Sequence, residues 1–243
     1  MPIQVVETQF LKTATRPADW PRGDFPEFAF VGRSNVGKSS MLNALTKKKK
    51  LARVSNTPGR TKALQFFEVR YRPTPKARPR PIRFCDLPGY GYAKVSRDER
   101  AKWTAMIGDY LRERPPLRAV VLIVDARHPP MESDHDALRF LTEAGRVVVV
   151  AATKMDKLPR TQRAKSLRTV EQDLSLPPGS AVPFSAEEGM GADALWARLH
   201  AMAGAAAPEA GGVLVAGEGA APEAGFDSAD PDAGEVEDEE AET

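Results

Sequence analysis

Two glycines, a lysine and a serine stand at a fixed spacing in the segment GRSNVGKS, which spans residues 32–39. The segment fits the pattern G-x-x-x-x-G-K-[ST], and it lies between an apolar run and a helical pattern, as this motif requires. In such a loop, glycines let backbone N–H groups turn toward a phosphate, and the positive end of the helix adds to the attraction. We expect Lys38 to reach the β- and γ-phosphates of a nucleoside triphosphate and Ser39 to bind Mg²⁺.

Two further polar loops carry groups suited to the same ligand. In DLPGYGYA (86–93), Asp86 can bind Mg²⁺ through a water, and Gly89 can present its N–H group to the γ-phosphate. In SNTPGRTK (55–62), Thr61 is expected to complete the Mg²⁺ shell. An ordinary surface loop that happens to contain a threonine remains the alternative for the second segment.

The segments TKMD (153–156) and FSA (184–186) predict which base is bound. The carboxylate of Asp156 could accept hydrogen bonds from both N1–H and the exocyclic amine of guanine, while the stem of Lys154 covers the ring. Adenine cannot donate that pair, so such a site can reject it by roughly 10⁴-fold. The backbone N–H group of Ala186 suits a contact with the guanine oxygen.

Apolar runs that alternate with helical patterns predict the fold. The runs predict six strands, at residues 28–32, 64–69, 81–86, 119–125, 146–152 and 181–186. Helical patterns occupy residues 38–46, 97–113, 133–144, 160–173 and 191–202. Uniformly apolar runs suit parallel strands that are covered on both faces, whereas the second and third runs are too close for a crossover and should be antiparallel. We therefore expect a three-layer α/β fold of the P-loop NTPase type, whose mostly parallel six-stranded sheet has one antiparallel edge strand and helices on both faces.

Charge divides the chain unequally. The last 40 residues contain 12 of the 33 acidic residues and none of the 35 basic ones, which leaves residues 1–203 with a net charge of +14. Residues 204–243 are rich in Ala, Gly and Pro, so we expect a disordered tail. This tail either competes with nucleic acid for the basic body or serves as a solubilising appendage. The expected organisation is an N-terminal extension (1–22), a nucleotide-binding domain (23–203) and the acidic tail (204–243).

The sequence also indicates the compartment. No apolar run approaches the roughly 18 residues that span a membrane, and the N-terminus lacks a signal sequence. We therefore expect a cytoplasmic protein with no membrane partner. The single cysteine, Cys85, cannot form an internal disulfide and suits a buried strand position.

Taken together, the motifs resemble the EngB (YihA/YsxC-type) family of bacterial GTPases, within the TrmE–Era–EngA–EngB class. The resemblance extends over about residues 9–203 and is carried by PEFAFVGRSNVGKSSMLNAL, TPGRTKALQFF, DLPGYGYA, VDARHPPMESD and TKMDKL. It implies a factor that hydrolyses GTP, binds the ribosome and assists assembly of the large subunit. Through ribosome supply, such a factor would also support cell division and septation.

The resemblance also implies the full set of site residues. The expected GTP-binding residues are Gly32, Arg33, Ser34, Asn35, Val36, Gly37, Lys38, Ser39, Ser40, Pro58, Gly59, Arg60, Thr61, Asp86, Leu87, Pro88, Gly89, Thr153, Lys154, Met155, Asp156, Phe184, Ser185 and Ala186. The expected catalytic residues are Lys38, Thr61 and Gly89. The expected Mg²⁺ ligands are Ser39, Thr61 and, through a water, Asp86.

Three positions bear on catalysis. Thr153 stands where most GTPases have Asn, so a hydroxyl replaces one amide contact. Tyr90 stands where Ras-like proteins carry the glutamine that orients water, so we expect slow intrinsic turnover. Asn35 resembles the residue of potassium-stimulated members of the class, and it either coordinates K⁺ against the phosphates or merely stabilises the loop.

Basic residues gather in two places, at residues 47–53 and 70–83. The first group adjoins the predicted nucleotide-sensing loop, so that loop could couple nucleotide state to RNA affinity. We expect contact with the large subunit or its rRNA, no DNA specificity and a monomeric protein. The alternatives are an RNA-binding module with a vestigial nucleotide site, a signalling switch that acts on proteins, and an ATPase.

Overall fold

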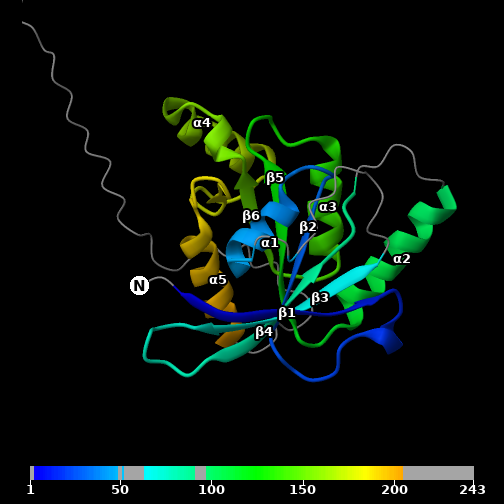
Figure 1. Ribbon diagram of the computed structural model, residues 1–243. Helices are drawn as coiled ribbons and strands as arrows, with labels where there is room; N and C mark the ends of the chain where they lie inside the picture. The colour runs from blue at the N-terminus through cyan, green and yellow to red at the C-terminus, as the bar shows by residue number, and fades with distance from the viewer. Residues whose placement is uncertain (1–2, 49–50, 52–62, 91–96, 205–243) are drawn as a thin grey trace, which may run out of the picture.

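The computed structural model describes residues 3–48, 51, 63–90 and 97–204 (Figure 1). Its strands are β1 (Gln4–Ala14), β2 (Glu27–Gly32), β3 (Leu64–Arg72), β4 (Arg80–Asp86), β5 (Leu117–Asp125), β6 (Val148–Thr153) and β7 (Val182–Pro183). Its α-helices are α1 (Lys38–Thr46), α2 (Arg97–Glu113), α3 (Glu132–Glu143), α4 (Arg160–Asp173) and α5 (Ala192–Gly204). Two short 3₁₀ helices are η1 (Pro17–Asp19) and η2 (Met155–Lys157). Within these described ranges, no helix has the length and apolar character that a membrane crossing requires.

The strands form one mixed sheet. In the described part of the chain the strand order is β1-β3-β4-β2-β5-β6-β7. The pairs β4–β2, β2–β5, β5–β6 and β6–β7 are parallel. β3 is antiparallel to both β1 and β4. The α/β fold class and the single antiparallel strand are therefore confirmed. That strand is not at the edge, however, because β1 covers it and brings the sheet to seven strands instead of the six predicted.

The N-terminal segment, expected to be a loose extension, supplies this edge strand. β1 pairs along its length with β3, from Gln4 opposite Arg72 to Ala14 opposite Leu64. Two register shifts interrupt the pairing, at Val6 and at Leu11. Such bulges break the regular alternation of inward and outward side chains. Because Val6 and Phe10 are also about half exposed, at 48% and 52%, the segment lacks the pattern of a buried strand.

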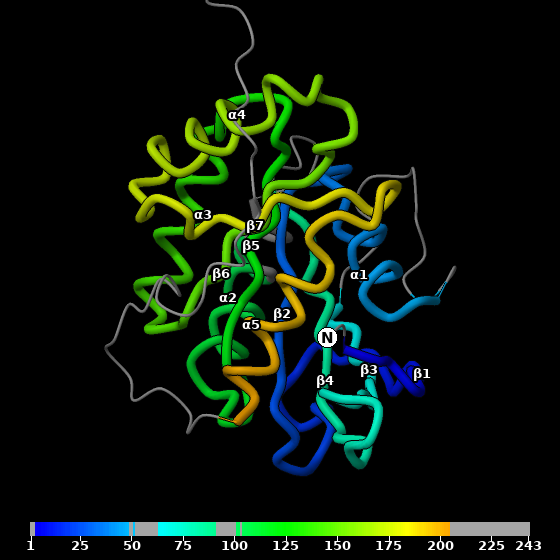
Figure 2. Tube along the Cα trace, turned by 90° about the vertical axis from the view of Figure 1, so that its left-hand side faces the viewer, coloured from blue at the N-terminus to red at the C-terminus, as the bar shows by residue number. Residues whose placement is uncertain are grey.

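Helices cover both faces of the sheet and create two apolar layers. α1 and α5 pack on one face through residues such as Leu42, Leu45 and Trp196. α2, α3 and α4 pack on the other through Leu111, Leu141 and Val170. Figure 2 shows α3 and α4 on one side of β2 and α1 on the other. This coverage explains why β2 and β6 are buried at every position.

A buried ionic cluster lies at the start of β2, at the opposite end of this strand from the phosphate loop. The carboxylate of Glu27 is fully buried and accepts hydrogen bonds from Arg114 Nε at 2.9 Å and Nη2 at 2.7 Å. Tyr110 donates its hydroxyl to Glu27 Oε1 at 2.8 Å, and Arg83 Nη1 lies 3.9 Å from Oε2. Arg114 also donates to the carbonyl oxygen of Pro21 at 3.0 Å. The cluster thus joins β2, β4, α2 and the segment before β2.

Candidate functional site

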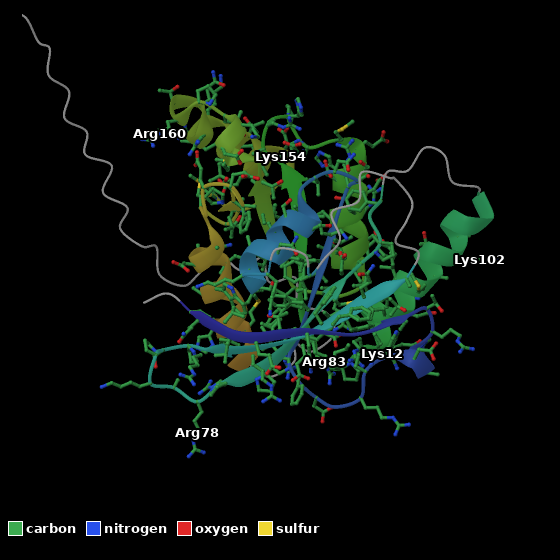
Figure 3. The ribbon with its side chains drawn as sticks, viewed as in Figure 1. Lys12, Arg78, Arg83, Lys102, Lys154 and Arg160 are labelled. Carbon is green, nitrogen blue, oxygen red and sulfur yellow. The ribbon has the colours of Figure 1, made fainter. Side chains whose placement is uncertain are left out.

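The predicted loops converge where parallel strands end. β2 leads through the phosphate loop into α1, β4 ends at Asp86, and β6 ends at Thr153. Because carboxyl ends of parallel strands lie at the same edge of a sheet, these segments come together there. Lys154, labelled in Figure 3, marks this edge.

The backbone of the phosphate loop takes conformations that its residue types allow. Gly37 has φ of 108°, and Asn35 has φ of 61°, a left-handed value that asparagine tolerates well. At Gly32, a Cβ atom would lie 2.8 Å from the carbonyl oxygen of Ile123, so a larger residue cannot enter without displacing β5. Gly37 precedes α1 and cannot cap it with a side chain. The first N–H groups of α1 therefore suit an anionic ligand.

Lys38 joins two of the predicted motifs. Its ammonium group forms an ion pair with the carboxylate of Asp86 and donates to the carbonyl oxygen of Leu87 at 2.7 Å. The side chain of Asp86 is 6% exposed, so this pair is shielded from water. Binding of a triphosphate at Lys38 must compete with this pair. Ser39, the next residue, lies in the first turn of α1 and is half-buried.

Thr153 connects the end of β6 to the phosphate loop. Its hydroxyl lies 2.6 Å from the carbonyl oxygen of Val36 and 2.9 Å from that of Val124. A hydroxyl has one proton, so these two carbonyls share a single donor. Thr153 stands where most GTPases have Asn. In this protein the Thr153 hydroxyl contacts the phosphate loop at Val36.

Lys154 makes a second connection to the same loop. Its ammonium group donates to the carbonyl oxygen of Asn35 at 2.7 Å and to Asp125 Oδ2 at 2.8 Å. Burial acts to raise the pKa of Asp125, but hydrogen bonds from Arg127 and Lys154 outweigh it and lower the pKa to about 2. Asp125 was not among the predicted site residues. The sequence feature that could have identified Asp125 is its position at the end of a predicted strand, in the segment VDARHPP.

Asp156 has a defined carboxylate orientation. Ser185 donates its hydroxyl to Oδ1 at 2.7 Å, and Lys157 Nζ lies 3.2 Å from Oδ2. Ser185 Oγ in turn accepts a hydrogen bond from the backbone N–H of Glu188 at 3.1 Å. Burial acts to raise the pKa of Asp156, but the contacts with Ser185 and Lys157 leave it below its ordinary value. The carboxylate is therefore ionised at neutral pH and can accept hydrogen bonds from a base.

Tyr90 does not project from its loop. Its hydroxyl donates to Asp134 Oδ1 at 2.9 Å, and Asp134 Oδ2 accepts the backbone N–H of Met131 at 2.9 Å. Burial and the neighbouring Asp134 both raise the pKa of Tyr90. The Tyr90 ring therefore contacts α3, and Asp134 also caps the N-terminus of that helix.

Several predicted residues lie outside the described part of the chain. These are Pro58, Gly59, Arg60 and Thr61. The structure therefore brings together the phosphate loop, Asp86 to Gly89, the TKMD segment and Phe184 to Ala186. The roles assigned to all of these residues remain predictions. Within the described ranges, no group of three or more His, Cys, Asp and Glu residues could hold a metal ion.

A G-x-x-x-x-G-K-S loop between β2 and α1, joined to the TKMD segment through Thr153 and Lys154, is the arrangement typical of a P-loop GTPase. The family model described as "50S ribosome-binding GTPase" matches residues 27–154, which is more than half of the chain. A relative called "Probable GTP-binding protein EngB", from Anaeromyxobacter sp. (strain Fw109-5), is 70% identical over 215 residues, covering 87% of this chain and all of the relative. The chain belongs to the EngB family of GTP-binding proteins.

Solved structures share the fold. A crystal structure of a probable GTP-binding protein EngB is 23% identical, with a TM-score of 0.56, and the match covers 73% of this chain and 98% of that one. Era in complex with MgGDPNP and a segment of 16S ribosomal RNA is 24% identical, with a TM-score of 0.57, over 82% of this chain and 60% of that one. At these sequence identities, the similarity to the two solved structures shows a shared fold only.

Proposed function

We propose that the protein is a slow GTPase that acts as a nucleotide-gated assembly factor for the large ribosomal subunit. Membership of a family described as ribosome-binding supports this proposal. The observation that carries it is a strongly basic body with exposed cations grouped on the β3–β4 hairpin. We further propose that it works as a monomer in the cytoplasm and affects cell division and septation only through ribosome supply.

Hydrolysis would depend on charge stabilisation at the phosphate loop. Lys38 would leave Asp86 and contact the β- and γ-phosphates, while the N–H group of Gly89 would hold the γ-phosphate. The hydroxyls of Ser39 and Thr61 and the carboxylate of Asp86 are oxygen donors of the kind that Mg²⁺ prefers, so these residues fit that ion. Bound Mg²⁺ would neutralise charge on the phosphates. Because Tyr90 is engaged by Asp134, it is unsuited to orient water, and turnover should be slow.

The cations proposed to contact RNA lie on the β3–β4 hairpin and at the end of α1. Lys76, Arg78 and Arg80 are exposed in the β3–β4 hairpin, and Figure 3 shows Arg78 pointing away from the sheet. Lys47 and Lys48 are exposed at the end of α1, whereas residues 49–50 and 52–53 of the first basic group lie outside the described part. Such groups attract RNA phosphates, and the attraction falls steeply as salt rises.

Sedimentation with purified ribosomal subunits tests the proposal. We expect the protein to pellet with the large subunit when it carries a non-hydrolysable GTP analogue, but not with GDP, at low and at moderate salt. Replacing Lys76→Glu and Arg78→Glu together should weaken this binding by about tenfold or more, because two phosphate contacts become repulsive. The matched control is Lys165→Glu with Arg168→Glu, which makes the same charge change on the exposed face of α4. Equal binding with GDP and the analogue, or equal loss in both variants, would contradict the proposal.

Potassium dependence is a separate proposal for Asn35. Its backbone φ of 61° can also be adopted by glycine, so Asn35→Gly removes the amide without straining the loop. If Asn35 coordinates K⁺, hydrolysis in potassium should exceed hydrolysis in sodium several-fold, and the variant should lose that difference. Equal rates of phosphate release in the two salts would show that Asn35 only shapes the loop.

A further inference from the structure

Four cations at the end of the β3–β4 hairpin lack acidic partners in the described part of the chain. We call Arg72, Lys76, Arg78 and Arg80 the hairpin cations. Lys76, Arg78 and Arg80 are exposed, and Arg72 is half-buried. Arg70, next to them, differs because it lies 3.2 Å from Glu68 and 4.0 Å from Glu7. The hairpin therefore presents an uncompensated positive surface.

The last described helix, α5, contacts β3 next to this surface through His200. His200, near the end of α5, lies with Nδ1 2.8 Å from the hydroxyl of Tyr71, and their rings pack edge to face. Tyr71 pairs in register with Arg80. Burial raises the pKa of Tyr71, and the charge of Arg80 acts to lower it. From His200, α5 continues for only four residues, about 6 Å, to Gly204.

The chain beyond Gly204 has the opposite charge. Residues 205–243 lie outside the described part, and their sequence contains 12 acidic and no basic residues. Six of these acids occur in the segment EVEDEEAE at 235–242. For the thirty residues before this segment, the disorder expected from their composition corresponds to an end-to-end distance of roughly 30 Å. Because His200 contacts Tyr71 only four residues before α5 ends, a segment at this distance along the chain can reach the hairpin cations.

We propose that the acidic segment 235–242 binds the hairpin cations of its own chain and competes there with RNA. Two observations support the acidic segment as the group that binds there: its charge is opposite to that of the hairpin cations, and it follows α5, which contacts β3 through His200. Tethering gives the segment an effective concentration in the millimolar range, so weak electrostatic attraction suffices for substantial occupancy. A partner with a denser array of phosphates displaces it. The competitive part rests on the proposed RNA contact, whereas the intramolecular contact does not.

A spin label on the tail tests the contact directly in the full chain. Ala241→Cys provides the attachment point, since the native Cys85 is buried. At about 50 mM salt, where the Debye length exceeds 10 Å, the nitroxide should broaden the amide signals of Thr74 and Ala77 in the hairpin. Amide signals of α4 should stay sharp. The broadening should disappear near 1 M salt, where the Debye length is about 3 Å.

Two variants of the labelled protein separate specific docking from general attraction. Lys76→Glu with Arg78→Glu should abolish the broadening, while Lys165→Glu with Arg168→Glu on α4 should preserve it. Broadening that survives the hairpin change, that extends equally over α4, or that is absent at low salt would overturn the proposal.

RNA binding distinguishes the competitive step from the proposed function. When the six acids of 235–242 are replaced by Asn and Gln in the full chain, affinity for a short single-stranded RNA at low salt should rise several-fold. The same RNA should remove the broadening in the labelled protein. Broadening without any binding to RNA or to large subunits would leave the tail contact intact and reject the proposed function. RNA binding that is unchanged by the neutral tail would reject the competition alone.

Discussion

Asp156→Asn should weaken GTP binding by about 10³-fold or more and should create a preference for xanthosine triphosphate. The carboxylate can accept hydrogen bonds from both N1–H and the exocyclic amine of guanine. An asparagine side chain keeps one acceptor oxygen, but its NH₂ group would face the second guanine donor, and two donors cannot form a hydrogen bond. A buried polar group that loses its partner is costly, and sites of this kind discriminate by roughly 10⁴-fold. Xanthine carries a carbonyl where guanine carries the amine, so it can accept the new amide donor.

Competition titrations with a fluorescent GDP analogue measure this exchange for GTP, xanthosine triphosphate and ATP. Asp136→Asn is the matched control, because it makes the same change on the exposed side of α3 and should leave all three affinities unaltered. If Asp156→Asn leaves the preference for GTP unchanged, Asp156 does not read the base. The interpretation of the chain as an ATPase would be supported only if ATP also bound more tightly than GTP.

Glu27→Ala should lower the free energy of unfolding by about 3–5 kcal/mol, because it leaves Arg114 and Arg83 buried without their anion. Arg114 would lose two hydrogen bonds, and the hydroxyl of Tyr110 would lose its acceptor. Such a loss is a large fraction of the stability of a typical domain. In Glu27→Gln the amide oxygen still accepts a hydrogen bond, so the loss should be smaller although the charge is gone.

Urea denaturation followed by fluorescence measures this effect. The control is Asp136→Ala, which removes one partner of the exposed pair Asp136–Arg139 and should cost less than about 1 kcal/mol. Since Glu27 lies at the opposite end of β2 from the phosphate loop, the folded fraction of Glu27→Ala should still bind GDP normally. A loss below 1 kcal/mol would show that the buried arginines find other partners.

Local patterns in the sequence predicted most of the fold and identified the main segments of the candidate site. α1, α2 and α4 were predicted with the bounds observed, because apolar periodicity and flanking turns define such helices. The position of the loop between β2 and α1 was predictable because its glycines, lysine and serine are close in sequence. The antiparallel pairing of β3 with β4 followed from the short connection between them.

Features that depend on distant partners were not predictable. The sequence contains no local sign that Glu27 meets Arg114, which is 87 positions away, or that Thr153 contacts Val36, which is 117 positions away. β1 was missed because its two bulges and exposed apolar residues obscure the alternation of a strand. The contact between Tyr90 and Asp134 was not predicted for a related reason, since packing brings together groups that are 44 positions apart.

The bulges in β1 also bear on the self-association of this protein. One side of this strand pairs with β3, and an edge strand of eleven residues would otherwise offer its other side to a second chain. The irregularities at Val6 and Leu11 increase the local twist, and the exposed charges of Glu7 and Lys12 disfavour a flat partner. A straightened β1 would therefore turn the edge of the sheet into a site for aggregation.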